Sequence, residues 1–245
     1  MALPQLSGGL FVTDGGLETD LIFNRGVDLP EFAAFVLLDD PAGMRALMDY
    51  YEGFFDIARE RGAGFILDTP TWRANRDWGE RLGYDRTRLA DTNKRWADVV
   101  AELREAWAGT GLPIVLDGNI GPRGDGYVPG EHMTSDEATA YHGEQIATFA
   151  ETPVEMVCVL TVNYAEEAVG VARAAAEHDL PSVISFTVET DGRLPTGQPL
   201  GDAIDQVDSE TGGAPAYFMV NCAHPTHFEN VLHGGAWRER IRGVR

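Results

Sequence analysis

The stretch Ala216–Val220 reads Ala-Tyr-Phe-Met-Val and stops abruptly on Asn221 and Cys222. A β-prone apolar run of this kind is typical of a buried strand, and the polar pair marks its carboxyl end. The sequence therefore predicts a strand that presents a thiol at its tip. As thiolate this group is a metal ligand and a nucleophile, whereas a buried cysteine acts as a small hydrophobic residue. The other cysteine, Cys158, lies inside the apolar run Met156–Leu160.

The same pattern, an apolar run that ends in polar residues, occurs five more times upstream. The predicted strands are Leu10–Thr13, Gly64–Leu67, Pro113–Leu116, Val154–Leu160, Ser182–Val188 and Ala216–Val220. Amphipathic stretches between them predict helices over Pro41–Arg61, Arg86–Trp107, Ser135–Ala150, Ala165–His178 and Leu200–Ser209. This alternation predicts a parallel α/β sheet, because a helix is the usual crossover between parallel strands. No linker rich in Pro, Gly or Ser interrupts the series, so we expect residues 1–245 to form one domain.

Polar residues gather at the carboxyl ends of the predicted strands, where the active sites of α/β barrels are built. An open doubly wound sheet also binds ligands there, but it usually carries a glycine-rich phosphate turn early in the chain. The first turn, Asp14-Gly15-Gly16-Leu17-Glu18, lacks the GxGxxG spacing. We therefore predict a (β/α)8 TIM-type barrel. Six strands are recognisable, and we expect the last one or two βα units to be missing from this sequence.

The composition is strongly acidic, with 39 Asp and Glu against 19 Lys and Arg and a formal net charge of −20. Such a surface repels nucleic acid and anionic membranes, and no segment has the apolar length of a membrane span, so we expect neither partner. Two cysteines in unlike settings do not indicate a disulfide framework, which favours a reducing cytoplasm. Oligomerisation stays open.

The acidity also suggests adaptation to high salt. Lys94 is the only lysine, and the acidic residues are spread along the chain rather than gathered in a tail. Because molar salt screens the repulsion between surface charges, we predict a midpoint of thermal unfolding several degrees higher in molar salt than in dilute buffer. Equal midpoints in the two buffers would remove the hypothesis.

Several strand-end motifs have more than one reading. The glycines beside Asp14 and Glu18 form either a solvated turn or a place where the backbone approaches a ligand and the acids hold a cationic group. Trp72 and Trp78 either line a pocket or cover the rim of the barrel. The glycine-rich stretch Asp117–Tyr127 reads as a functional loop without the Lys and Ser/Thr of a P-loop. In this loop Arg123 either holds a carboxylate or pairs with Asp125.

Two histidines follow the last predicted strand. Cys222, His224 and His227 offer three soft ligands, but ligands so close in sequence rarely complete one tetrahedron around zinc. We therefore expect the histidines to lie at the start of a helix that begins near Thr226.

Together these motifs resemble the homocysteine S-methyltransferase family. The resembling segments run almost from end to end, and their order and spacing are more specific than any one of them. They are Thr13–Thr19, Gly26–Leu29, Asp68–Asn75, Gly118–Pro122, Ser185–Thr187, Gly192–Gly197 and Val220–Cys222. The fold of this family is a (β/α)8 barrel, in agreement with the alternation above.

The resemblance implies a zinc-dependent transfer of a methyl group from a sulfonium-type or similar donor to homocysteine or a related thiol, a step of methionine biosynthesis. In the family, three cysteine thiolates hold a zinc ion that keeps the homocysteine sulfur as thiolate. By position Cys222 matches the first zinc ligand. The substrate-binding residues implied are Asp14, Gly15, Thr69, Asn119 and Asn221. The expected partners are therefore two small molecules, the thiol acceptor and the methyl donor.

Two departures from the family pattern stand out. The family's other two zinc ligands lie in a Gly-Gly-Cys-Cys motif near the C-terminus, and the sequence reaches Arg245 without one. We therefore expect the natural protein to continue past Arg245. The second departure is Leu160, where many members carry a glutamate that faces the substrate amino group. Glu155, Glu166 and Glu189 are conceivable substitutes, or the acceptor is a different thiol.

Two other functions remain open at this point. Asp14, Asp68 and Asp117 follow three successive predicted strands and could hold a hard cation such as Mg²⁺ in a different kind of barrel enzyme. The chain could also be a non-catalytic, thiol-binding relative that has lost its zinc.

Overall fold

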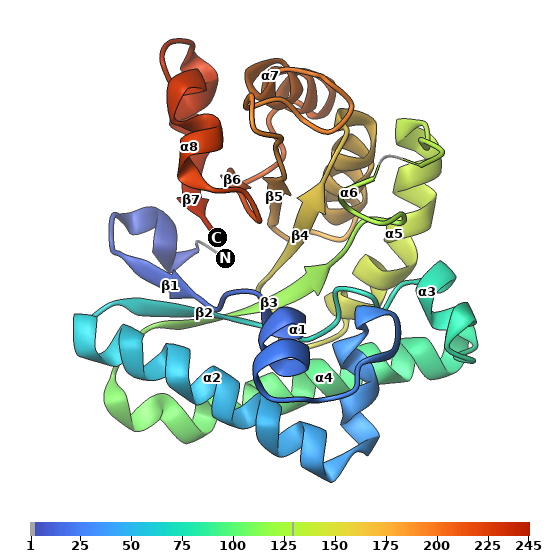
Figure 1. Cartoon of the computed structure of the whole chain (residues 1–245), viewed down its shortest axis with the longest axis vertical. Helices are drawn as coiled ribbons and strands as arrows, with labels where there is room; N and C mark the ends of the chain where they lie inside the picture. Colours follow the sequence, from blue (N-terminus) through green and yellow to red (C-terminus); the bar gives the residue numbers. More distant parts are fainter. Residues whose placement is uncertain (1–2, 129) are drawn as a thin grey trace. The chain divides into compact units, whose positions relative to one another are not determined.

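The computed structural model describes residues 3–128 and 130–245 and has an α/β fold (Figure 1). The chain divides into two compact units. The first contains the chain up to Asn119 together with Thr148–Met156, and the second contains Ile120–Ala147 and Val157–Arg245. Each unit is described by itself, and the expectation of one domain stays a prediction.

The first unit holds three parallel strands in chain order: β1 (Phe11–Thr13), β2 (Gly64–Asp68) and β3 (Ile114–Ile120). Its helices are α1 (Leu17–Thr19), α2 (Pro41–Arg61), α3 (Arg76–Arg81) and α4 (Arg86–Trp107). Single helical turns cover Pro4–Ser7, Asp20–Asn24, Pro30–Phe32, Ala34–Asp39 and Ala108–Thr110. The predicted start of α2 is confirmed. Asp40 directly precedes the helix, and its carboxylate accepts a hydrogen bond from the Ala42 N–H, while Pro41 is the first helical residue.

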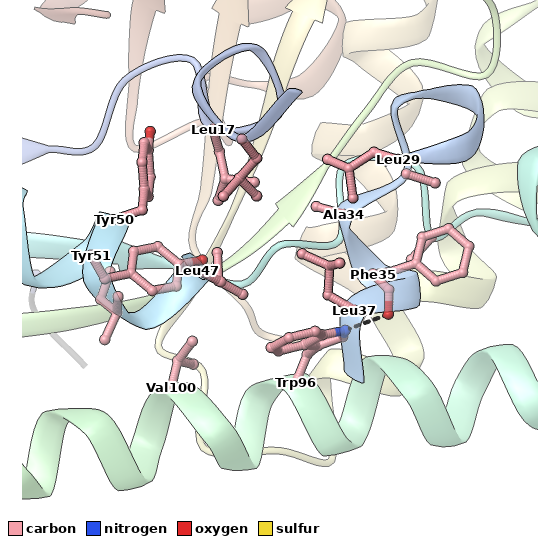
Figure 2. Close-up of a cluster of buried hydrophobic side chains, with 14 of the residues drawn as sticks. Leu17, Leu29, Ala34, Phe35, Leu37, Leu47, Tyr50, Tyr51, Trp96 and Val100 are labelled. Atoms are coloured by element: carbon pink, nitrogen blue, oxygen red, sulfur yellow. Dashed lines mark hydrogen bonds between the residues drawn. The ribbon is translucent and has the colours of Figure 1, made fainter. Parts of the chain in front are cut away.

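A large apolar core lies between the helices and one face of this sheet. Phe65, Leu67 and Leu116 point from β2 and β3 toward side chains of α2 and α4. Figure 2 shows part of this core, in which the Trp96 indole N–H donates to the Phe35 carbonyl oxygen over 2.9 Å. Because side chains alternate along a strand, Asp68, Asp117 and Asn119 belong to the opposite face and are not held in this core.

The second unit holds four parallel strands, also in chain order: β4 (Met156–Val162), β5 (Ser182–Phe186), β6 (Tyr217–Val220) and β7 (Ile241–Val244). Its helices are α5 (Ser135–Ala150), whose last turn belongs to the first unit, α6 (Ala165–Glu177), α7 (Leu200–Thr211) and α8 (Pro225–Phe228). Shorter turns cover Glu229–Val231 and Ala236–Arg240. In Figure 1, α6 and α7 lie side by side, and α6 contacts both α7 and β5.

The six predicted strands and five predicted long helices are confirmed, with shifts of a few residues at their ends. One expected loop is corrected. Asp117–Ile120 continue β3, because the Asp117 carbonyl accepts from the Thr69 N–H in the sheet ladder and Gly118 leaves room for the Phe149 ring. Strand β7 was not predicted. The described residues thus contain seven strands, one more than predicted, and the full (β/α)8 count stays a proposal. No helix among them is long and apolar enough to cross a membrane.

Candidate functional site

The turn after β1 rests on α2. Asp14 is buried, and the backbone N–H of Gly15 donates to the Tyr50 hydroxyl over 3.0 Å. A Cβ at position 15 would lie 3.2 Å from the Phe54 ring, so glycine permits this close approach. Gly15 is therefore held against α2 in the turn that follows β1, and substrate binding by Asp14 and Gly15 stays a prediction.

Hydroxyl groups join the ends of β2 and β3. The Thr71 hydroxyl donates to the Asn119 carbonyl oxygen over 2.7 Å and lies 2.6 Å from the Thr69 hydroxyl. Since the Thr71 proton is used on the carbonyl, Thr69 is the donor of this pair, and its oxygen accepts from the Asn119 N–H over 3.0 Å. Thr69 is fully buried. This arrangement favours a role for Thr69 in positioning Asn119 over the direct substrate contact that was predicted.

Acidic side chains lie beside this network. Asp68 and Asp117 are buried register partners on neighbouring strands, and the Tyr51 hydroxyl donates to the Asp68 carbonyl oxygen over 2.7 Å. Burial raises the pKa of Tyr51 well above its ordinary value, and the charges of Asp14 and Asp68 raise it further. Tyr51 is thus a neutral hydrogen-bond donor at neutral pH.

The described residues give no support to the hard-cation alternative. Asp14, Asp68 and Asp117 belong to the same unit, yet across residues 3–128 and 130–245 no three His, Cys, Asp or Glu side chains are arranged to hold a metal ion.

A buried arginine follows β2. The Arg73 guanidinium lies 4.0 Å from the centre of the Trp72 ring and 3.8 Å from that of Trp78. A cation between two indole faces is attracted by both ring quadrupoles. The sequence predicted that Trp72 and Trp78 line a pocket or cover the barrel rim. Instead, their rings lie against the Arg73 guanidinium of the same unit.

In the second unit, Asn221 connects three strand ends. Its side-chain oxygen accepts from the Thr161 N–H over 2.9 Å and from the Ser185 hydroxyl over 2.8 Å. Its side-chain nitrogen donates to the Thr161 hydroxyl over 2.9 Å and to the Cys222 sulfur over 3.2 Å. An amide has two donors and two acceptor positions, so all four are used inside the protein. This geometry favours a positioning role for Asn221 over the predicted substrate contact.

Two of these residues have strained backbones. Thr161 has φ of 66° and Cys222 has φ of 54°, in the left-handed region that is costly for a residue other than glycine and most of all for a β-branched one. The pairing of β4 with β5 shifts register between Val159 and Val162, so Thr161 lies in a bulge. Bulges and strained residues are enriched next to active sites.

Cys222 is exposed directly after β6, as predicted, and Cys158 is buried in β4. The backbone N–H of Cys222 donates to the Arg245 carbonyl oxygen over 3.0 Å, so β7 also fixes its place. His224 begins α8, as expected, and its Nδ1 lies 2.8 Å from the Thr226 hydroxyl. The described part of the chain therefore offers one exposed thiol, and the residues around it do not fit a complete zinc site.

The loop that follows β3 is tied to α6. Glu167 and His142 are both buried and lie 2.9 Å apart, and the same Glu167 oxygen accepts from the Arg123 N–H over 2.8 Å. Near the other end of the loop, the Met133 N–H donates to the Tyr164 hydroxyl over 3.2 Å. Burial, followed by the charge of Glu167, raises the pKa of Tyr164 above its ordinary value. The Arg123 guanidinium itself lies over the Tyr141 ring.

The three conceivable substitutes for the family glutamate lie in different surroundings. Glu155 precedes the first residue of β4 and pairs with Arg104 over 2.8 Å, so it lies at the wrong end of the strand. Glu166, in the first turn of α6, accepts a hydrogen bond from Gln206, and Glu189 is exposed after β5. Leu160 itself is a buried apolar residue of β4.

Sequence reasoning missed the supporting residues. Tyr50 and Tyr51 lie on α2, distant in sequence from the strand ends that they contact. The roles of Thr161 and Ser185 depend on pairing between strands. Of these, only Ser185 and Thr161 carried a signal, as polar residues within or just after an apolar run.

Comparison with known proteins gives two kinds of match, one to a family model and one to solved structures. A family model described as homocysteine S-methyltransferase matches residues 11–239. Among solved structures, the homocysteine methyltransferase MmuM from Escherichia coli in its metallated form has a TM-score of 0.76 at 18% identity and covers 98% of this chain and 92% of that chain. Its oxidized form has a TM-score of 0.75 at 18% identity and covers 93% and 78%. At this identity the likeness is one of fold. A comparison with curated protein sequences gave no match.

Proposed function

Because the chain belongs to the homocysteine S-methyltransferase family, we propose that it transfers a methyl group from a sulfonium donor to the thiol of homocysteine. The acceptor thiolate attacks the methyl carbon, and a new S–CH3 bond forms as the donor's S–CH3 bond breaks. The electron pair leaves with the donor sulfur, which becomes a neutral thioether. The acceptor thiol first releases its proton to solvent, since the thiolate is the nucleophile.

The observation that supports this proposal most directly is the exposed Cys222 thiol at the end of β6, with its sulfur and backbone both held by hydrogen bonds. Zinc is a weaker part of the proposal. The family implies it, but residues 3–128 and 130–245 supply one exposed thiol, that of Cys222, and no group of three ligands. Cys222 would be one ligand of such a zinc ion.

The test is Cys222→Ser. Purified protein is given homocysteine and S-methylmethionine, and methionine is quantified by mass spectrometry. We expect the rate to fall at least about tenfold, because a hydroxyl is a poorer zinc ligand than the thiolate it replaces. Bound zinc measured on the same sample should fall with the rate.

The matched control is Cys158→Ala, which removes the buried thiol of β4. Its rate should stay within about twofold of wild type, because it lies outside the proposed site. Full activity and unchanged zinc in Cys222→Ser would contradict the proposal. Wild-type protein that binds homocysteine but never methylates it would favour the non-catalytic relative.

A further inference from the structure

Thr161 has a backbone conformation that its own side chain disfavours. Its φ of 66° lies in the left-handed region, where a β-branched residue is strained. It lies within β4, at the point where the pairing with β5 shifts register between Val159 and Val162. Strain of this kind persists only where the surrounding contacts hold the residue in place.

The left-handed conformation brings two groups of Thr161 onto one amide. The Thr161 N–H donates to Asn221 Oδ1 over 2.9 Å, and the Thr161 hydroxyl accepts from Asn221 Nδ2 over 2.9 Å. In a regular strand the N–H lies in the plane of the sheet, whereas the side chain stands roughly perpendicular to it. A regular strand residue would therefore direct these two groups apart, and the left-handed turn directs both to Asn221.

This double contact decides which end of the Asn221 amide faces Cys222. A backbone N–H can only donate, so the atom that faces it is the amide oxygen, and the Ser185 hydroxyl donates to the same oxygen over 2.8 Å. The amide nitrogen then points to the Thr161 hydroxyl and to the Cys222 sulfur, which is 3.2 Å away. Cys222 is exposed, so Thr161 acts through Asn221 on a thiol that a substrate can reach.

Resting on the proposed function, in which the Cys222 thiol belongs to the site, we propose that Thr161 is a positioning residue for methyl transfer. Its strained backbone holds the Asn221 amide, and the amide holds the Cys222 sulfur in one direction. All three residues belong to the second unit. Because the orientation of the groups at a site contributes strongly to the rate, relief of this strain should slow the reaction and leave the fold stable.

The experiment compares Thr161→Gly with Thr161→Ser, using homocysteine and S-methylmethionine as substrates. Glycine adopts a left-handed backbone without strain but has no hydroxyl, whereas serine keeps the hydroxyl and lacks only the methyl group. In Thr161→Gly we expect kcat to fall about fivefold, the effect of one lost hydrogen bond. The KM for homocysteine should stay within about twofold of wild type, because the acceptor still binds. Thr161→Ser should keep kcat within about twofold of wild type.

Urea unfolding of the same proteins separates positioning from packing. The urea midpoint of Thr161→Gly should shift by no more than about 0.5 M, because relief of the left-handed strain offsets the lost hydrogen bond. Asp179→Gly is the matched control, since Asp179 also has a left-handed backbone, with φ of 56°. Asp179 is exposed and precedes β5, at the opposite end of the sheet from Cys222. Its replacement should leave kcat within about twofold and the urea midpoint equal to or above that of wild type.

Several results would overturn the inference. A normal kcat in Thr161→Gly would mean that the amide keeps its direction without the hydroxyl, and a raised KM alone would make Thr161 a substrate-binding residue. Equal losses of kcat in the glycine and serine variants, with a large fall in both urea midpoints, would mean a packing role only. If Thr161→Gly does not fold, a normal kcat in Thr161→Val, which removes the hydroxyl and keeps the bulk, refutes the inference. Wild-type protein that methylates no thiol would instead remove the proposed function, and this inference with it.

Discussion

Replacing Asn221 with alanine is expected to lower the free energy of unfolding by about 3 kcal/mol, because buried partners would lose their hydrogen bonds together. Thr161 and Ser185 are almost inaccessible to water, so the Thr161 N–H and the Ser185 hydroxyl would have no alternative acceptor. Each unsatisfied buried donor costs about 1–3 kcal/mol, and water entering the new space offsets part of this. Urea unfolding followed by circular dichroism measures the change.

Asn221→Asp separates acceptance from donation. A carboxylate can still accept from Thr161 and Ser185, but it cannot donate to the Thr161 hydroxyl or the Cys222 sulfur. It also introduces a buried charge, so we expect this variant to be destabilised as well. Asn24→Ala is the control, since Asn24 is an exposed asparagine bonded to Asp20, and it should change stability by less than about 0.5 kcal/mol.

The alanine variant, Asn221→Ala, decides between two roles for this residue. If Asn221→Ala is as stable as wild type but its KM for homocysteine rises, the residue binds substrate, as the sequence prediction had it. If it is destabilised and Cys222 loses its fixed place, kcat should fall more than KM rises. The four bonds within the second unit favour the second outcome.

The strands could be predicted because their apolar runs are short, β-branched and separated by amphipathic helices. Strand β7 gave no such signal. Ile241-Arg242-Gly243-Val244 holds an arginine and a glycine, and only its pairing with β6 makes it a strand. The end of β3 was missed for a similar reason, because Asp117 and Gly118 have low strand propensity and are held by the Thr69 ladder bond and by Phe149.

The same distinction between local pattern and distant contacts applies to the candidate site. Residue types at strand ends identified Asp14, Asn119 and Cys222 as positions of interest. What these side chains do depends on partners distant in sequence. The orientation of the Asn119 amide follows from Asp68, 51 positions away, and the saturated amide of Asn221 follows from Thr161, 60 positions away. No local pattern encodes such pairings, and the left-handed backbone of Thr161 contradicts its own propensity.

Helix packing in the second unit gives a further large effect. Gly170→Ala is expected to destabilise the protein by about 3 kcal/mol, at the upper end of what overpacking usually costs. A Cβ at position 170 of α6 would overlap the Ala138 Cβ and lie 2.7 Å from both the Ala138 carbonyl carbon and the Thr139 nitrogen of α5. Backbone atoms cannot move aside as a flexible side chain can, so the two helices must separate.

Gly143→Ala is the matched control on α5. Its added Cβ would lie 4.0 Å from the Ala174 Cβ, an ordinary contact. Alanine is also the better helix former, so this variant should be as stable as wild type or more stable by up to about 1 kcal/mol. Urea unfolding should show a lower free energy of unfolding for Gly170→Ala and an equal or higher one for Gly143→Ala, with unchanged m-values. That result would establish that contact at Gly170 sets the helix separation. A Gly170→Ala protein as stable as wild type would contradict it.

The separation of α5 and α6 also bears on the loop that follows β3. His142 on α5 and Glu167 on α6 pair one turn away from Gly170, and the same glutamate anchors the loop at Arg123. Helices pushed apart by one methyl group would lengthen this 2.9 Å contact and release the loop. Gly170→Ala should therefore make residues near Arg123 more accessible to limited proteolysis, and Gly143→Ala should not. Loss of stability without that change would mean that the anchor tolerates the displacement.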